Sequence, residues 1–225
     1  MHGNRHGVAD PLIDYELSRL CVAAMLHPSD HGRAYFFCYN MYAAIDIEPG
    51  STNNTIAWGP KTLIDDWPSL VQANFGFVDA VLPNPDKKEE MYFFFREKYA
   101  LINTEPGTTK NHIVDGPKDI STEWPSLKEA NFTIVDAVLP SPVHKYRAYF
   151  FSGEHYALIE FAPGTTNNFV VNGPKPITSE WPSLREARFK TVDAILPHPD
   201  DAYKAYVFSD TKYVLIHFQP GMFLF

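Results

Sequence analysis

The sequence repeats itself at a fixed step of 57 residues. The heptapeptide at 77–83, FVDAVLP, returns at 134–140 as IVDAVLP and at 191–197 as TVDAILP, and a weaker copy stands at 21–26. The same step separates Tyr42, Tyr99, Tyr156 and Tyr213, the Pro-Gly pairs that begin at 49, 106, 163 and 220, and Trp67, Trp124 and Trp181, each of which opens a Trp-Pro-Ser-Leu tetrapeptide. Such a period indicates one supersecondary unit that is repeated as a ring or an array.

The third copy predicts what that unit is. Apolar or alternating runs at 135–139, 146–151, 156–161 and 169–172 are separated by turn residues, and the last run ends at Gly173-Pro174. Four short strands joined by such turns form an antiparallel sheet. The segment from Ser179 to Ala187 predicts a short helix, with Ser179 as N-cap and Pro182 in the first turn.

One sheet and one helix per copy make a propeller blade, and four copies predict an all-β, four-bladed β-propeller. The blades cover about residues 20–75, 76–132, 133–189 and 190–225 of a single domain. The last copy lacks a clear fourth strand and the Trp-Pro-Ser-Leu helix. The N-terminal segment 1–19 is one candidate to complete blade four, and residues 222–225 are the other; we expect both to contribute.

Composition excludes some classes of function. A net charge of −8 argues against a nucleic-acid surface, which needs clustered Lys and Arg. No apolar run has the length of a membrane span, and the N-terminus shows no signal peptide, so we expect a cytoplasmic protein. For Cys21 and Cys38, which have no counterparts in the other copies, two buried thiols are favoured over a disulfide.

The repeated residues resemble a known family. Asp-Ala after a β-branched residue, then Tyr-Phe-Phe, Lys-Tyr-Ala-Leu-Ile, Pro-Gly, Gly-Pro-Lys and Trp-Pro-Ser-Leu are similar to the hemopexin repeat, and most like the hemopexin-type albumin-2 proteins of legume seeds. The resemblance covers about residues 20 to 225. It implies a propeller with an axial channel in which backbone carbonyls hold calcium or sodium. It also implies spermine or another polyamine as a ligand, heme as a further ligand, and association as a homodimer.

Carried onto this sequence, the channel positions are Asp79, Asp136 and Asp193, and in the first copy we align Ala23 with these aspartates. Carbonyl coordination of a hard cation would tolerate that alanine, because every residue has a carbonyl group. A site of four carboxylates would not. The three aspartates are also the predicted polyamine site, because carboxylates pair with ammonium groups. The alternative is that each Asp only braces its own strand.

Two histidines are candidate heme ligands. His27 and His198 each precede a proline in the loop after the first strand of blades one and four, which are neighbours in a closed ring. An imidazole with access to the iron is what heme ligation needs. The alternative is that both are loop histidines without a ligand.

No catalytic motif is present: the sequence has no His-Glu-x-x-His, no Gly-x-Ser-x-Gly and no phosphate-binding glycine loop. The sequence therefore predicts a non-enzymatic ligand-binding protein of the seed-albumin kind. Two alternatives stay open: a module for protein–protein interaction or self-association, and a nitrogen storage protein.

Overall fold

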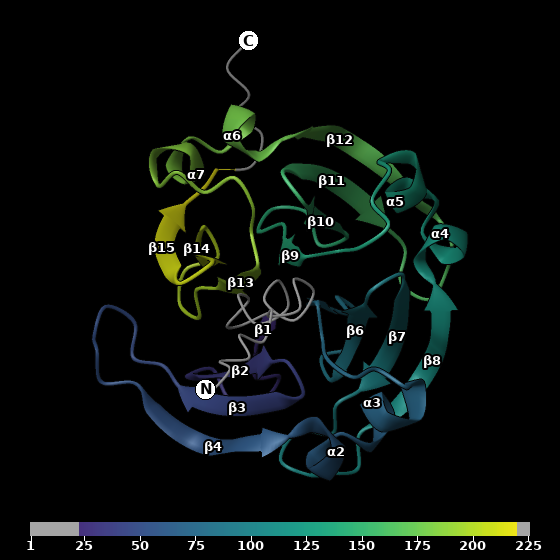
Figure 1. Ribbon diagram of the computed structural model, residues 1–225, viewed down its shortest axis with the longest axis vertical. Helices are drawn as coiled ribbons and strands as arrows, with labels where there is room; N and C mark the ends of the chain where they lie inside the picture. The colour runs from purple at the N-terminus through teal and green to yellow at the C-terminus, as the bar shows by residue number, and fades with distance from the viewer. Residues whose placement is uncertain (1–22, 220–225) are drawn as a thin grey trace, which may run out of the picture.

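The structure is a computed structural model that describes residues 23–219, and within that range four antiparallel sheets surround a common centre (Figure 1). This arrangement is the predicted four-bladed β-propeller. Blade one contains β1 (Ala23–Leu26), β2 (Arg33–Cys38), β3 (Met41–Asp46), β4 (Thr55–Thr62), α2 (Leu63–Asp66) and α3 (Pro68–Ala73). Blade two contains β5 (Ala80–Pro83), β6 (Glu90–Phe95), β7 (Lys98–Asn103), β8 (His112–Asp119), α4 (Ile120–Glu123) and α5 (Pro125–Glu129). Blade three contains β9 (Ala137–Pro140), β10 (Arg147–Ser152), β11 (His155–Phe161), β12 (Asn168–Pro176), α6 (Ile177–Glu180) and α7 (Pro182–Glu186).

Blade four consists, within the described residues, of β13 (Ala194–Pro197), β14 (Lys204–Ser209) and β15 (Lys212–His217). The two segments predicted to complete it, 1–19 and 222–225, lie outside the described residues. The repeated tyrosine of blade four differs from the other three. Tyr213 is 67% exposed, whereas Tyr42, Tyr99 and Tyr156 are buried.

The inner strands close the ring. β1 contacts β5 and β13, and β9 contacts the same two strands from the other side. Within residues 23–219, each inner strand is hydrogen-bonded to another strand on one side only. Because an edge strand leaves alternate backbone N–H and C=O groups unpaired along its free side, backbone polar groups of all four blades face the axis.

The outer strands are longer than predicted. β12 runs through the Gly-Pro pair to Pro176 instead of ending at Asn172. Gly173 makes this possible: its φ is 102°, and a Cβ at this position would lie 2.8 Å from the Tyr156 carbonyl oxygen. The pairing of β11 with β12 shifts register on either side of Leu158, and the strand continues past the irregularity.

The predicted helix is two helices. α6 ends before Trp181 and α7 begins at Pro182, so Ser179 lies inside α6 and is not an N-cap. Its hydroxyl donates to the Pro176 carbonyl at 2.7 Å. Pro182 does stand in the first turn of α7, and because it has no N–H to donate backwards, α6 cannot continue through it.

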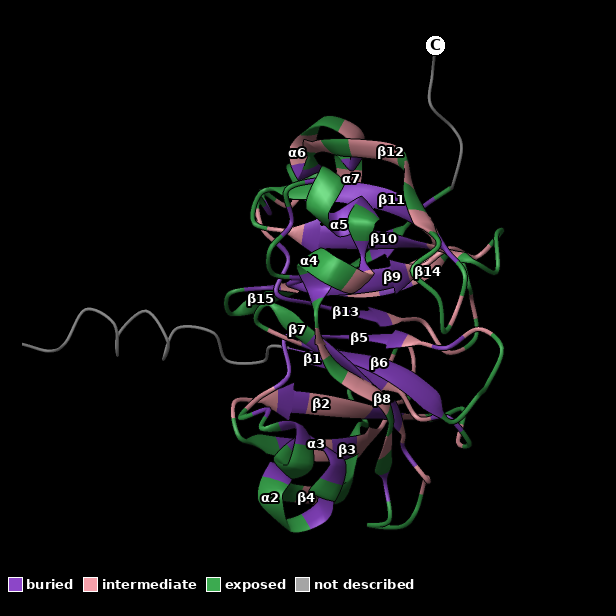
Figure 2. Cartoon of the chain, turned by 90° about the vertical axis from the view of Figure 1, so that its right-hand side faces the viewer, coloured by how far each residue is buried: buried purple, intermediate pink, exposed green. Residues whose placement is uncertain are grey.

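The tryptophans join adjacent blades. The Trp67 ring lies 5.5 Å from Phe37 of its own blade and 5.4 Å from Phe93 of the next, measured between ring centroids. Trp124 repeats this with Phe94 at 5.9 Å and Phe150 at 5.5 Å. Buried residues accordingly dominate strands such as β5, β6 and β9 to β11, while exposed residues gather on the helices and outer strands (Figure 2).

Cys38, at the end of β2, is disulfide-bonded, so the prediction of two thiols is wrong. Cys21, the other cysteine of the chain, lies outside the described residues. A single pair of cysteines has no spacing signature that distinguishes a bridge from two thiols, because bridging depends on how close the two residues lie in the fold. Across residues 23–219, none of the helices has both the length and the apolar character that crossing a bilayer requires.

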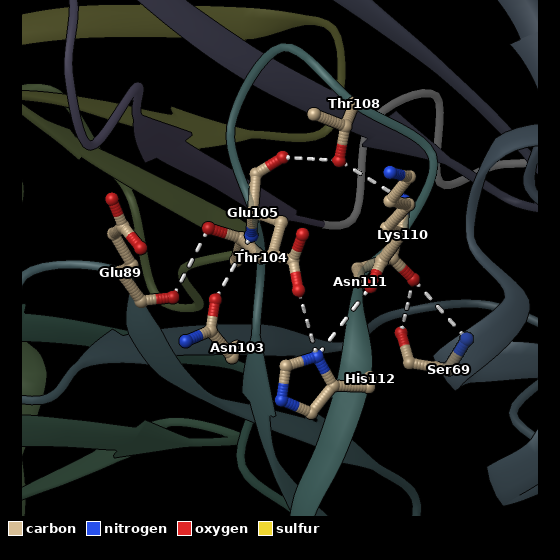
Figure 3. A network of polar contacts seen from close by, with 9 residues as sticks. All are labelled: Ser69, Glu89, Asn103, Thr104, Glu105, Thr108, Lys110, Asn111 and His112. Atoms are coloured by element: carbon tan, nitrogen blue, oxygen red, sulfur yellow. Dashed lines mark hydrogen bonds and ion pairs between the residues drawn. The ribbon is translucent and has the colours of Figure 1, made fainter.

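An asparagine ties blade two to blade one, and another ties blade three to blade two. Asn111 accepts hydrogen bonds from the Ser69 N–H at 3.1 Å and from its hydroxyl at 2.6 Å (Figure 3). It also donates to the Asp66 carbonyl at 2.7 Å. One step of 57 residues later, Asn168 accepts from both donors of Ser126 in the same way. The blades are therefore held together by polar bonds as well as by aromatic packing.

Asn111→Ala removes three such bonds and leaves buried partners without them. We expect the free energy of unfolding to fall by about 1–3 kcal/mol. Urea denaturation at pH 7 measures it. Asn54→Ala is the matched control, because Asn54 is the exposed counterpart of Asn111 and accepts only from the Glu48 N–H. An equal loss in both variants would contradict the role assigned to Asn111.

Candidate functional site

The three predicted aspartates stand directly before the inner strands β5, β9 and β13. Asp79, Asp136 and Asp193 are 4%, 9% and 7% exposed. Each carboxylate accepts a backbone N–H from the hairpin turn between the second and third strands of its own blade. The three bonds come from Arg96 at 2.5 Å, Gly153 at 2.7 Å and Asp210 at 2.6 Å.

These bonds fix an otherwise unfavourable turn. Arg96, Gly153 and Asp210 have φ values of 51°, 55° and 53°, in the left-handed region that only glycine adopts at little cost. A charge-assisted bond from a buried carboxylate stabilises that backbone. The geometry therefore gives each Asp the alternative role considered above, that of bracing its own blade.

The alignment of Ala23 with the aspartates was wrong by one residue. Ala23 pairs with Phe37 in the same register in which Ala80 pairs with Phe94, so Ala23 is the counterpart of the alanine that follows each Asp. The counterpart of Asp79 is Val22, which lies outside the described residues. The weak first copy shares too few identical residues with the other copies to fix its alignment to them. The pairing of β1 with β2 fixes that alignment. The fourth carboxylate is missing in either alignment.

The axis can therefore offer main-chain oxygens more readily than carboxylates. Among residues 23–219 no three His, Cys, Asp or Glu side chains form a group that could hold a metal ion. Four edge strands, in contrast, present unpaired carbonyl groups to a shared space. Hard cations such as calcium accept such oxygens as ligands. The residues thus fit a carbonyl site for calcium or sodium and do not fit a ring of four carboxylates.

The two candidate heme ligands share one structural task. His27 Nδ1 accepts the backbone N–H groups of Ser29 at 3.2 Å and Asp30 at 3.1 Å, and His198 Nδ1 accepts the N–H of Asp200 at 3.1 Å. The equivalent residues of blades two and three do the same with other side chains: Asn84 Oδ1 accepts from Asp86, and Ser141 Oγ accepts from Val143 and His144. Residues 27, 84, 141 and 198 are 57 residues apart and so occupy the same position of the repeat. The sequence spacing alone could have shown that His27 is equivalent to Asn84 and Ser141.

This arrangement decides which nitrogen carries the proton. A neutral imidazole whose Nδ1 accepts hydrogen bonds is protonated at Nε2 and has no lone pair there for iron. Burial, then the positive charge of Arg33, lowers the pKa of His27, while Asp30 opposes and Lys88 adds to the effect. His27 lies against Tyr35 with ring centroids 5.1 Å apart, and His198 stacks on Tyr206 at 5.8 Å. Heme ligation by these residues stays a prediction that their geometry does not favour.

The chain is similar to seed proteins of legumes. It is 28% identical to albumin-2 of Lathyrus sativus over 201 residues, which cover 89% of this chain and 87% of that protein. It is 29% identical to albumin-2 of Pisum sativum over 203 residues, with 89% and 85% covered. The chain is a homologue of the legume albumin-2 proteins. No protein-family model matches the sequence.

Solved structures agree with this albumin-2 homology. A hemopexin-fold protein from cow pea and a 2S albumin seed protein from Dolichos both superpose with a TM-score of 0.80 at 28% identity, covering 90% of this chain and 88% of each. A plant lectin with two metal-binding sites from Cicer arietinum gives 0.79 at 29% identity, covering 89% and 88%. These relatives are seed albumins and lectin-like proteins with the hemopexin fold, and none of their names denotes an enzyme.

His27→Asn tests the turn role of this histidine, because Asn84 performs it in blade two. A histidine whose pKa is lowered in the fold stabilises the native state fully above its unfolded pKa of 6.5. It loses that contribution as the pH falls through the lower native pKa. We therefore expect the difference in free energy of unfolding between wild type and variant to shift against the wild type as the pH falls from about 7.5 to about 5. Urea titrations at each pH measure it. A constant difference would contradict the assignment.

Proposed function

We propose that this albumin-2 homologue is a non-enzymatic binding protein that holds a structural cation, calcium or sodium, on the propeller axis and binds a polyamine such as spermine. The observation that carries the proposal is the closed ring of four inner strands, each with one unpaired edge toward the axis. The metal-binding sites of the lectin from Cicer arietinum support a cation in this fold.

The ligands of that cation would be main-chain oxygens. Calcium takes six to eight oxygens, and convergent carbonyls with water supply them without any carboxylate. The residues involved are those at the channel, Ala23, Asp79, Asp136 and Asp193, through their carbonyl groups or those of adjoining residues. Their side chains are already used inside the blades, so the cation would stabilise the ring and not take part in chemistry.

The charges favour a different place for the polyamine. The axial carboxylates would have to leave their turn N–H groups to pair with an amine. Asp115 and Glu123, by contrast, lie around Lys118 at 2.8 Å and 3.5 Å and line a cavity of about 350 Å³ with Tyr99 and Trp124. Burial, followed by the negative charges of Asp115 and Glu123, raises the pKa of Tyr99, which indicates a negative potential in this cavity.

The other junctions between blades lack this surplus. At the junction of blades one and two, Lys61 pairs with Asp66, and Trp58 stands at the position of Asp115. At the junction of blades three and four, Lys175 pairs with Glu180, and Asn172 stands at that position. Two carboxylates for one lysine, beside aromatic rings, suit an alkylammonium group. We therefore assign the amine to the junction of blades two and three, and retain the axial aspartates as the competing site.

Three expectations from the sequence remain as part of this proposal. They are heme as a further ligand, a homodimer, and a cytoplasmic location. The disulfide at Cys38 is more typical of an oxidising compartment than of the cytosol. A role in nitrogen storage is compatible with the seed-albumin relatives.

The axial cation is tested by elemental analysis of the purified protein and of Asp136→Asn. Because carbonyl groups survive the substitution, we expect the same metal content per chain in both. Removing the metal with a chelator should lower the thermal midpoint, since a ligand that binds only the folded state stabilises it. Loss of the metal from the variant would indicate a carboxylate ligand, and a metal-free wild type would contradict the cation.

Spermine binding is tested by calorimetric titration at low and physiological salt. We expect the double variant Asp115→Asn, Glu123→Gln to bind roughly tenfold or more weakly, since it removes both charges that would pair with the amine. Added salt should weaken binding to the wild type. Asp136→Asn is the control. If it alone abolishes binding, the axial site is correct; no heat in either buffer would contradict polyamine binding.

A further inference from the structure

Two recurring positions hold large apolar side chains at every described junction between blades except that of blades one and two; at the junction of blades four and one they are Leu215 and Ile47, which line a cavity of about 820 Å³. At the other two of these junctions, a leucine in the third strand of one blade meets a phenylalanine at the end of the third strand of the next: Leu101 with Phe161, and Leu158 with Phe218. At the junction of blades one and two, the same two positions are held by Ala44 and Thr104. Both side chains that fill the other junctions are absent here.

The phenylalanines close their junctions by packing on the aromatic core. Phe161 lies 5.7 Å from Trp124, and Phe218 lies 5.9 Å from Trp181, between ring centroids. Thr104 makes a polar contact instead, since its hydroxyl donates to the Glu89 carbonyl at 3.1 Å (Figure 3). The tryptophan of blade one therefore lacks the ring that covers its counterparts.

A deeper cavity results. It has a volume of about 440 Å³, and it extends past Trp67 and Tyr35 to His27 and Arg33. The cavity at the next junction has about 350 Å³ and is bounded by Phe161. The residues that replace His27 and Arg33 in that blade, Asn84 and Glu90, do not line it. The substitution of one phenylalanine by threonine thus opens the inner part of the junction.

One wall of this cavity is a fixed aromatic surface. Trp58 is 49% exposed and stands where the other blades have Asp115 and Asn172. Its indole N–H donates to the Tyr42 hydroxyl at 2.8 Å and to Asp66 at 3.1 Å, which holds the ring in place. The Lys61 ammonium lies 4.0 Å from the centre of this ring. The part of the rigidly held ring that remains exposed at the cavity mouth is a favourable surface for an apolar ligand face.

The opposite wall is a polar loop with little freedom. Thr108 donates to the Glu105 carbonyl and accepts the N–H of Lys110, and Asn111 binds Ser69, so the loop is held before any ligand arrives (Figure 3). Hydroxyl groups of Thr104, Thr108 and Thr109 line the cavity along it. A preorganised wall of donors and acceptors lowers the entropic cost of binding.

Arg33 and Asp66, the charged groups in the inner part of the cavity, are already paired, and Lys110 lies on the loop at its edge. Arg33 binds Asp46 at 2.7 Å, and Asp66 binds Lys61 at 3.1 Å. His27, with Nδ1 occupied by backbone N–H groups, offers Nε2–H as a neutral donor. An ionic ligand would have to compete with these pairs. A neutral ligand would not.

We propose that the cavity between blades one and two binds a neutral, hydroxyl-rich ring, such as a sugar unit of an oligosaccharide. One face of a sugar carries C–H groups that pack on Trp58 and Tyr35, and its hydroxyls match the threonines, Asn111 and His27. The other described junctions have the same backbone but lack this combination. The site is separate from the axis and from the acidic junction assigned to the amine.

The experiment uses the full chain and two substitutions that the protein itself supplies. Thr104→Phe introduces the residue found at Phe161 and Phe218, and Trp58→Asn introduces Asn172. Wild type and variants are titrated in a calorimeter with lactose, maltotriose, mannotriose and triacetylchitotriose, and with spermine for comparison. Phe169→Ala, which removes an aromatic ring that is 54% exposed on β12, is the control.

We expect at least one of the neutral sugars to bind wild type and the control, and to bind both cavity variants at least tenfold more weakly. Spermine binding should be the same in Thr104→Phe as in wild type, so this result is distinguishable from failure of the amine site. Ovalbumin with and without its glycans tells whether free or protein-linked sugars are bound. No binding of any of the four sugars, or unchanged binding by Thr104→Phe, would overturn the proposal.

Discussion

Three of the four junctions of the ring depend on the packing of one tryptophan between two sheets. A single blade cannot bury both faces of its own sheet, so its stability requires a neighbour. Trp67 meets that requirement by contacting Phe37 behind it and Phe93 ahead of it. Within the described residues, blades four and one contact each other through Phe36 and Phe208, whose ring centroids lie 6.0 Å apart. Closure therefore uses different side chains from those of the other junctions.

Because the copies share one backbone, they act as controls for one another. Positions that perform the same structural task in every copy, such as the turn acceptors at 27, 84, 141 and 198, explain the fold and carry no special function. Function should lie where the copies differ. Where one junction has Thr104 and the next has Phe161, the two differ in how far the space between the blades is filled. Where one has Trp58 and the next has Asp115, the mouth of the cavity is aromatic in the first and acidic in the second. One scaffold thus supplies a neutral cavity and an acidic one at successive junctions.

Most of the fold could be read from periodicity, because spacing alone specifies which residues are equivalent. The same arithmetic would have shown that His27 and Asn84 share a position, and so that the histidine is one of several acceptors for a turn. Other features needed coordinates. The continuation of β12 past Gly173 depends on a positive φ, and the one-residue offset of Ala23 depends on its pairing with β2. The disulfide of Cys38 depends on which residue its sulfur meets in the fold. The cavity behind Thr104 combines both kinds of information, since the sequence shows the substitution and only packing shows the space.

The direction of the aspartate side chains separates the axis from the junctions in function. A carboxylate that braces a turn inside its blade has one of its oxygens occupied by that turn, whereas main-chain oxygens at the inner edge are independent of side-chain identity. A site built from such oxygens tolerates an aliphatic residue at the fourth position, and it distinguishes cations by size and oxygen number instead of by charge pairing. It is therefore suited to a structural ion that every copy helps to hold. Selective binding of a ligand requires side chains that differ between the copies. In the described part of the chain, such side chains lie at the junctions between the blades.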